Sequence, residues 1–237
     1  MSKQPYRADD VAGNLADVKA RIDAAMTAQG LDRPRPLIIA VSKRQSADHI
    51  RRALDVGHRL FGENKVQEAQ NKWPALLRDY PDARLHLIGP LQSNKAADAV
   101  ALFDVIESLD RPKLAHALAK AMQDQNKRPS LFIQVNTGDE PQKSGVALNA
   151  LDDFIALCCK ELGLPVSGLM CLPPVDDDPA LHFALLAKLA QRHHLPQLSM
   201  GMSGDYELAA LMGASQVRVG TAIFGPRPST LPPDETF

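Results

Sequence analysis

Residues 37–43 read LIIAVSK, a short apolar run that ends in a serine and a lysine. A run of this length without alternation, preceded by Pro34 and Pro36, is typical of a strand that is buried on both faces of a parallel sheet. Seven further strands are expected, most of them separated by helices, and the eight begin near residues 37, 59, 84, 102, 131, 166, 197 and 217. Eight such units that close on themselves predict an α/β protein with a (β/α)8 TIM barrel.

An open, doubly wound sheet is the alternative, but its Gly-x-Gly-x-x-Gly fingerprint occurs nowhere in the chain. A helix is expected before the first strand, because apolar residues fall at helical spacing and Gly30 follows them. These residues are Val11, Leu15, Val18, Ile22 and Met26. We therefore expect an N-terminal helical segment (1–30) that packs on the barrel, one barrel domain (31–225) without a second β domain, and a proline-rich tail (226–237).

The composition excludes several classes of protein. Lys and Arg number 27 and Asp and Glu number 28 in 237 residues, so the net charge of −1 provides no basic field for nucleic acid. The apolar runs fall far short of the roughly 18 to 20 residues that span a membrane, and the N-terminus lacks the apolar core of a signal peptide. Three cysteines without metal-ligand spacing suit a reducing compartment. We expect a cytoplasmic monomer that binds neither nucleic acid, membrane nor metal.

Several expectations concern polar residues of loops and helix ends. Ser93 is expected to cap a helix, and the strand that follows is placed at residues 102–106. His182 is placed on the exposed surface of a helix, and the three aspartates at 176–178 in a solvated loop.

Polar side chains follow several of the expected strands, and in a TIM barrel the carboxyl ends of the strands line the functional face. Lys43 comes directly after the first strand. A partly desolvated lysine loses its proton more readily, and a neutral amine is the nucleophile that forms an imine with an aldehyde. The alternative is a lysine that extends into solvent. Glu63 and Asn64 end the second strand, where they either bind a ligand or, for Asn64, cap the next helix.

The seventh and eighth strands are followed by residues that suit a phosphate group. Residues 200–205 read MGMSGD and lead into a helix, and Gly220 and Thr221 follow the eighth strand. Backbone N–H groups and hydroxyls at such positions bind anions, and barrels often hold a phosphate at these two loops. Ordinary turns are the alternative.

Arg218 lies within the eighth strand. It either points into the barrel, or it faces outward or pairs with a carboxylate such as Glu63 or Glu107. Because a guanidinium only donates hydrogen bonds, a ligand nitrogen that faces it would be held unprotonated.

Several segments spread over residues 37–225 match one known family together. They are 40–43 (AVSK), 61–64 (FGEN) with 66–68, 88–89 with 91–95, 134–136, 143–145, 168–170, 198–203 (LSMGMS) with 205, and 217–225 (VRVGTAIFG). On these segments the chain resembles the pyridoxal phosphate homeostasis proteins, which have the barrel of the alanine racemases (PLP fold type III). The last two segments are long and specific.

The resemblance implies pyridoxal 5′-phosphate (PLP) as the cofactor, held as a Schiff base on Lys43. It also implies Arg218 at the pyridine nitrogen, and Asn64 and Met200 near the ring. Four residues would surround the phosphate, namely Ser203, Gly204, Gly220 and Thr221.

The resemblance further implies a protein without catalytic residues that takes part in intracellular PLP (vitamin B6) homeostasis, buffering PLP or delivering it to apoenzymes. Two alternatives remain. A PLP-dependent racemase or lyase needs a second acid/base opposite the lysine, for which the chain offers Tyr6, Tyr80 and Tyr206; the last is closest to the expected site. A barrel enzyme acting on another phosphorylated metabolite would use Lys43 as its Schiff-base lysine.

Overall fold

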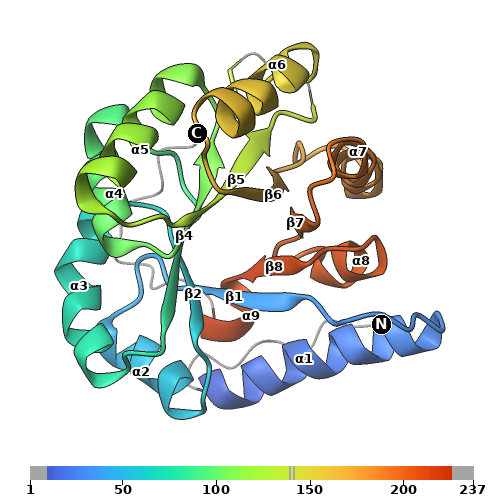
Figure 1. Ribbon diagram of the computed structural model, residues 1–237. Coiled ribbons are helices and arrows are strands. Elements are labelled where there is room, and N and C mark those ends of the chain that lie inside the picture. The colour runs from blue at the N-terminus through green and yellow to red at the C-terminus, as the bar shows by residue number, and fades with distance from the viewer. Residues whose placement is uncertain (1–9, 139, 141, 226–237) are drawn as a thin grey trace.

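Eight parallel strands close into one barrel in the computed structural model, which describes residues 10–138, 140 and 142–225 (Figure 1). The strands pair in chain order, and Ala40 of the first strand pairs with both Phe61 and Val219, which closes the sheet. The predicted TIM barrel is confirmed. The strands are β1 (Leu37–Val41), β2 (Leu60–Glu63), β3 (Arg84–Leu87), β4 (Val105–Leu109), β5 (Ser130–Val135), β6 (Val166–Cys171), β7 (Gln197–Ser199) and β8 (Gln216–Val219).

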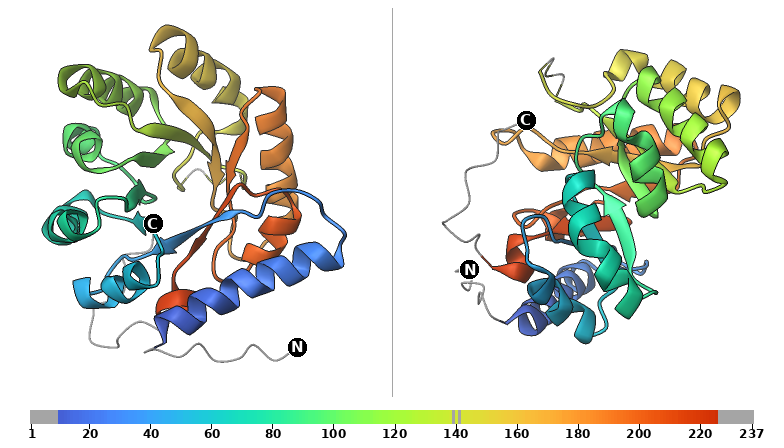
Figure 2. Two further views of the ribbon diagram at one scale, coloured as in Figure 1. Left: turned by 60° about the horizontal axis from the view of Figure 1, so that its bottom comes forward. Right: turned by 90° about the vertical axis from the view of Figure 1, so that its left-hand side faces the viewer.

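Helices cover the outside of the barrel (Figures 1 and 2). They are α2 (Ala47–Asp55), α3 (Val66–Asp79), α4 (Ala96–Leu102), α5 (Pro112–Gln125), α6 (Leu151–Ala156), α7 (Pro179–Arg192), α8 (Tyr206–Leu211) and α9 (Thr221–Phe224). Three short turns complete them: η1 (Ser93–Lys95), η2 (Leu148–Ala150) and the π-helical η3 (Leu157–Glu161). Their apolar faces bury side chains such as Trp73 and Leu118, which builds the core between helices and strands.

Helix α1 (Val11–Ala28) lies outside the barrel, along α8 and α9 (Figure 2). All five apolar residues that predicted it are buried. Asp10 caps its first turn by accepting a hydrogen bond from Gly13, and the Asn14 side chain donates to the Ile223 carbonyl at 2.9 Å. Gly30 follows with φ +63°, which suits glycine at a helix end.

The fourth unit differs from the expectation. The segment that follows η1 has four buried residues at helical spacing, and the chain remains helical to Leu102. Strand β4 therefore begins at Val105 rather than at residue 102. The four buried residues are Ala96, Ala99, Val100 and Phe103. Ser93 is not a cap, because Gln92 occupies that position and Ser93 is the first residue of the turn.

His182 on α7 is buried, so its predicted exposure is wrong. Its Nδ1 lies 3.0 Å from the Thr137 hydroxyl, and its Nε2 lies 3.3 Å from the Asp177 carboxylate. An imidazole can face the core when both ring nitrogens have partners. Asp178 caps α7 by accepting from Ala180.

Two negative findings apply to the described residues. Within them, no helix is long and apolar enough to cross a membrane, and no three His, Cys, Asp or Glu side chains gather as a metal site. The expected tail at 226–237 lies outside the described residues.

Candidate functional site at the carboxyl end of the barrel

The carboxyl ends of β1, β7 and β8 bring several predicted site residues together. Gly220 follows β8 beside Val41, the last residue of β1; a Cβ on Gly220 would lie 3.4 Å from the Val41 Cβ. The Gly220 N–H donates to the Ser203 hydroxyl at 3.2 Å, which joins the loops after β7 and β8. Lys43 is half-buried and lies two residues beyond Val41. Closure of the barrel therefore places the lysine next to the loops that suit a phosphate.

The other predicted residues of these loops differ in exposure. Met200 is buried, and its N–H donates to the Gln216 carbonyl at 3.2 Å. Gly204 is exposed, and a Cβ there would meet no atom within 4 Å. Thr221 is also exposed, as the first residue of α9. The loops thus present backbone and hydroxyl groups to solvent above a buried floor.

Helix α3 fixes the turn that carries Lys43. The Glu68 carboxylate accepts from the backbone N–H of Arg44 at 2.5 Å and from Lys72 Nζ at 2.8 Å. Lys72 also donates to the Ser42 carbonyl at 2.8 Å. Arg44 has φ +61°, a left-handed conformation that is costly for arginine. The contacts on both sides of Lys43 therefore hold a strained turn in place.

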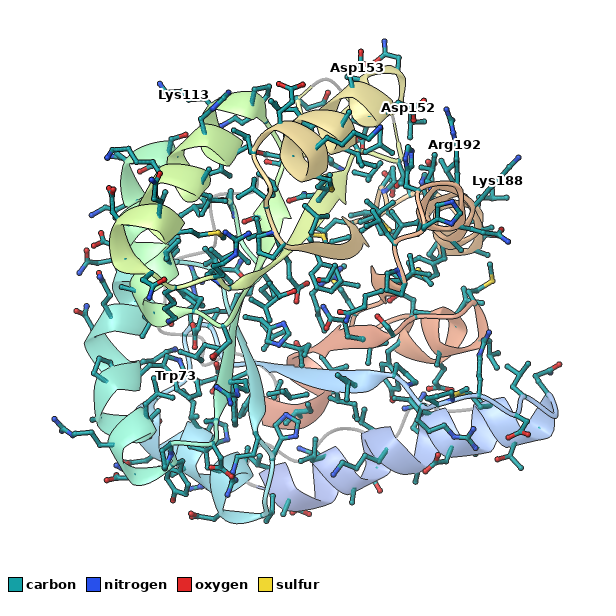
Figure 3. All side chains as sticks on the ribbon, in the orientation of Figure 1. Trp73, Lys113, Asp152, Asp153, Lys188 and Arg192 are labelled. Carbon is teal, nitrogen blue, oxygen red and sulfur yellow. The ribbon has the colours of Figure 1, made fainter. Side chains whose placement is uncertain are left out.

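Glu63 supports the same turn from beneath and does not face the barrel mouth. Its Oε1 accepts from Ser42 Oγ (2.5 Å), Lys72 Nζ (2.9 Å) and Trp73 Nε1 (2.9 Å), and Figure 3 shows Trp73 between α3 and the barrel. The side chain is 0% exposed, and burial raises the pKa of Glu63, although the charge of Lys72 acts in the opposite direction. Glu63 is thus a structural anchor of β2 and α3.

Asn64 follows β2, which β1 separates from β8 in the closed barrel. It does not cap α3, because Lys65 occupies the cap position. Asn64 lines a cavity of about 120 Å³ together with Gln134 of β5 and Lys143 of the loop after β5, among other residues at the ends of β2, β3, β5 and β6. Gly89 allows this arrangement, since a Cβ there would lie 2.3 Å from the Asn64 carbonyl oxygen.

Arg218 points into the barrel and is 3% exposed. Its Nη1 donates to Ser199 Oγ at 2.5 Å and its Nη2 donates to the Cys171 carbonyl at 2.8 Å. Glu107 Oε2 lies 3.9 Å from Nη1, so Arg218 both faces inward and has a carboxylate neighbour. Two of the arrangements that the sequence left open for Arg218, an inward orientation and a pairing with Glu107, therefore occur together.

Sequence reasoning missed most of the residues that support the site. Glu68 and Lys72 form an i,i+4 ion pair, a signal that marks a helix face but not what the face holds. Glu107 was named only as one of two carboxylates that could pair with Arg218, and nothing in the sequence marks Ser199; only the closed barrel brings both to Arg218.

Comparison with known proteins assigns the family. Residues 14–228 match the family described as alanine racemase, N-terminal domain. The pyridoxal phosphate homeostasis protein of Escherichia coli K12 is 36% identical over 232 residues, which covers 92% of this chain and 97% of that protein. The protein of the same name from Pseudomonas aeruginosa is 40% identical, with 92% and 96% covered. The chain belongs to the family of the pyridoxal phosphate homeostasis proteins.

Solved structures agree with the family and with the fold. PipY from Synechococcus elongatus is 36% identical, and 91% of this chain matches 100% of that one. Its structure without PLP gives a TM-score of 0.80 and its structure with PLP bound gives 0.78. Alanine racemase from Corynebacterium glutamicum, at 19% identity and a TM-score of 0.66 over 95% of this chain and 63% of that one, shows the shared barrel. The predicted resemblance to the homeostasis proteins and the alanine-racemase-like fold are confirmed.

Proposed function

We propose that this member of the pyridoxal phosphate homeostasis family binds PLP as a Schiff base on Lys43 and takes part in intracellular PLP homeostasis. The observation that carries the proposal is the convergence of Lys43, the two phosphate-suited loops and Arg218 at one end of the barrel. The PLP-bound structure of PipY supports it.

The residues present fit PLP chemically. Ser203, Gly204 and Thr221 offer hydroxyls and N–H groups to a phosphate, as anion sites require, and the Gly220 N–H donates to the Ser203 hydroxyl and so positions it. Asn64 and Met200 would lie beside the ring. The Lys43 amine would add to the aldehyde carbon of PLP and expel one water, which leaves a C=N bond between the two.

The surroundings favour binding over turnover. PLP enzymes use the ring as an electron sink, and a donor-only guanidinium at the pyridine nitrogen weakens that sink because the nitrogen stays unprotonated. Tyr206 is 2% exposed and stacks beneath the Arg21 guanidinium, 5.6 Å from the ring centre. The Tyr80 hydroxyl donates to Asp55 at 2.5 Å. Neither of these two positions supports a second acid/base opposite Lys43, and Tyr6 lies outside the described residues.

The first experiment is an absorption spectrum of the purified protein with added PLP, before and after borohydride. We expect a visible band that borohydride abolishes, and a reduced adduct that mass spectrometry maps to Lys43. Lys43→Ala should lose the band, whereas Lys120→Ala should keep it, because Lys120 is exposed on α5 and 77% accessible. A wild-type protein without such a band would overturn the proposal, and a reducible adduct with a sugar phosphate instead would indicate another phosphorylated metabolite.

The second experiment separates a carrier from an enzyme. The PLP-loaded protein is incubated with each common amino acid in deuterated water, and NMR follows the α-proton. We expect no exchange above the background of free PLP. Rapid exchange would indicate a racemase or lyase.

We propose further that the protein acts in the cytoplasm as a monomer and passes PLP to apoenzymes. Mixing the loaded protein with a PLP-dependent apoenzyme should restore the activity of that enzyme. The activity should return faster than it does with free PLP supplied at the concentration that the loaded protein releases on its own. Light scattering should give the mass of one chain, 25.8 kDa.

A further inference from the structure

The Arg218 guanidinium is held by two strands at once. Nη2 donates to the Cys171 carbonyl of β6, and Nη1 donates to the Ser199 hydroxyl of β7. Arg218 itself belongs to β8, so the fork spans three neighbouring strands of the lumen. A guanidinium is planar, so two hydrogen bonds fix the orientation of its plane and the direction in which its remaining N–H groups point.

Ser199 can accept from Arg218 only if its own proton goes elsewhere. A hydroxyl has one donor, and the Ser199 hydroxyl lies 2.5 Å from Glu107 Oε2. An ionised carboxylate only accepts hydrogen bonds, so Ser199 must donate to Glu107 and turn its lone pairs to Arg218. Arg218 can only donate, so the two ends of the chain Arg218–Ser199–Glu107 agree: the carboxylate takes the Ser199 proton and thereby holds the Ser199 lone pairs toward the guanidinium.

Glu107 is in turn held on its other oxygen. Oε1 lies 2.7 Å from His86 Nδ1 and accepts from Gln216 Nε2 at 2.9 Å. The side chain is 0% exposed, and although burial acts to raise the pKa of Glu107, the hydrogen bond and charge of His86 and the charge of Arg218 bring it below its ordinary value. The lumen thus holds a fixed negative charge 3.9 Å from the guanidinium.

We infer that Glu107 is a positioning residue for PLP, which acts through Ser199 to orient the Arg218 guanidinium toward the pyridine nitrogen. The inference rests on the function proposed above. Glu107 does not contact PLP in this scheme; it accepts the Ser199 proton, which fixes the rotation of the Ser199 hydroxyl that Arg218 donates to, and it offsets the charge of the cation. Glutamine has nearly the same shape but is neutral and can donate as well as accept, so Glu107→Gln removes the charge and the carboxylate that holds the Ser199 proton while it keeps the volume.

The test measures PLP affinity by titration of the visible band, with circular dichroism to check folding. Glu107→Gln should raise the Kd for PLP by about tenfold, the scale of one charge-assisted hydrogen bond. Asp104→Asn is the matched control: it makes the same chemical change three residues earlier, where the carboxylate accepts from Leu85 at the amino end of the barrel. Its Kd should stay within about twofold of the wild-type value. Equal affinity of Glu107→Gln and wild type would overturn the inference.

A second background distinguishes positioning from general loosening of the barrel. Lysine lacks the planar fork, so in Arg218→Lys protein there is no guanidinium for Ser199 to orient. Glu107→Gln should then change the Kd by less than about twofold, because the two changes act on one interaction and are not additive. The wavelength and pH dependence of the visible band should likewise respond to Glu107→Gln only when Arg218 is present. The same loss in both backgrounds would show that Glu107 acts by another route.

A third variant covers the case in which Glu107→Gln does not fold. Ser199→Ala keeps the charges of Glu107 and Arg218 and removes only the relay between them, and it should also weaken PLP binding. Unchanged affinity in folded Ser199→Ala protein would overturn the inference. Failure of the wild type itself to form the Lys43-dependent band would instead overturn the proposed function.

Discussion

Glu63 and Glu107 are both 0% exposed, yet their surroundings change their acidity in opposite directions. Glu63, at the end of β2, faces outward to α3, and burial raises its pKa. Glu107, in β4, faces the lumen, and its pKa is lowered although burial acts to raise it. The difference lies in how each carboxylate is satisfied. Glu63 accepts three hydrogen bonds on Oε1, and Oε2 has no partner among the described residues, whereas Glu107 accepts on both oxygens.

The comparison teaches that burial alone does not decide whether a charge is stable inside this barrel. The space between the strands and the outer helices offers Glu63 one cation, Lys72. The lumen offers Glu107 the imidazole of His86 and the guanidinium of Arg218. A buried charge is favourable only when partners and hydrogen bonds repay its desolvation. The lumen therefore stabilises the charge of Glu107 beside Arg218, whereas Glu63 in the outer layer anchors the turn that carries Lys43.

The largest effect should come from removing the lumen carboxylate. Glu107→Ala leaves Arg218 and His86 buried beside a cavity, and loss of one partner of a buried ion pair costs about 3–5 kcal/mol. Urea unfolding at pH 7 without PLP measures this free energy. A cost below about 1 kcal/mol would mean that the lumen network contributes no more than a surface pair, and the contrast with Glu63 would lose its basis.

His58 extends the comparison to a base in the outer layer. It lies before β2, 8% exposed, with Nε2 2.7 Å from the Leu60 carbonyl oxygen. Burial lowers its pKa from 6.5 to about 4, against the effect of the Leu60 hydrogen bond. Between these two values the unfolded chain binds a proton that the folded chain does not, so stability falls as the pH falls through this window, by about 3 kcal/mol at roughly 1.4 kcal/mol per pKa unit.

The measurement is the urea midpoint of wild type and His58→Gln from pH 7 to pH 4. At pH 7 the variant should be the less stable protein, because it has lost packing and a hydrogen bond. It has no imidazole to protonate in the unfolded state, so it does not lose stability in this way as the pH falls. The deficit should therefore shrink on acidification and reverse near pH 4. Parallel curves would show that the imidazole is not disfavoured as a cation in this layer.

The barrel was predictable because most of its strands and helices are local patterns. The run at 37–41 and the five apolar residues of α1 carry their signal within a few residues. β4 was misplaced for a physical reason: its centre holds Glu107 and Ser108, and polar residues do not indicate a buried strand until the barrel closes around a polar lumen. Leu102 and Phe103 were apolar enough to attract the prediction, although they end a helix.

The candidate site could likewise be predicted only in part. Lys43, Ser203 and Gly220 could be predicted because each follows a strand, and strand ends converge in any barrel of this class. Their supporting contacts could not, since the hydrogen bond between Ser199 and Glu107 joins residues 92 positions apart. The roles of all eight predicted site residues toward PLP stay predictions until the binding experiments are done.

A smaller effect is expected for Glu63→Gln. Because the folded pKa lies above the unfolded value, the folded state holds its proton longer, and stability falls as the pH rises above about 4.5. Removing the charge should therefore change stability at pH 7 by less than about 1 kcal/mol, and the variant should gain on wild type as the pH rises. Urea midpoints from pH 4 to pH 8 test this. A loss as large as that of Glu107→Ala would show that Glu63 is held as a needed anion after all.

The smallest effect tests whether proximity to Arg218 is enough to stabilise a negative charge. Burial raises the thiol pKa to about 12 both for Cys158 in the outer layer and for Cys171 at the end of β6, although the charge of Arg218 acts to lower the latter. At pH 8 roughly one thiol in ten thousand would then be ionised, and thiolate is the form that alkylates. Iodoacetamide at pH 8 should leave both unlabelled in the native protein and label both in urea, which shows that the reagent is active; half-buried Cys159, whose pKa burial also raises, serves as the more accessible comparison. If Cys171 alkylated as readily as Cys159, the field of Arg218 would stabilise any anion nearby, and the hydrogen bonds to Glu107 would not be what distinguishes the lumen from the outer layer.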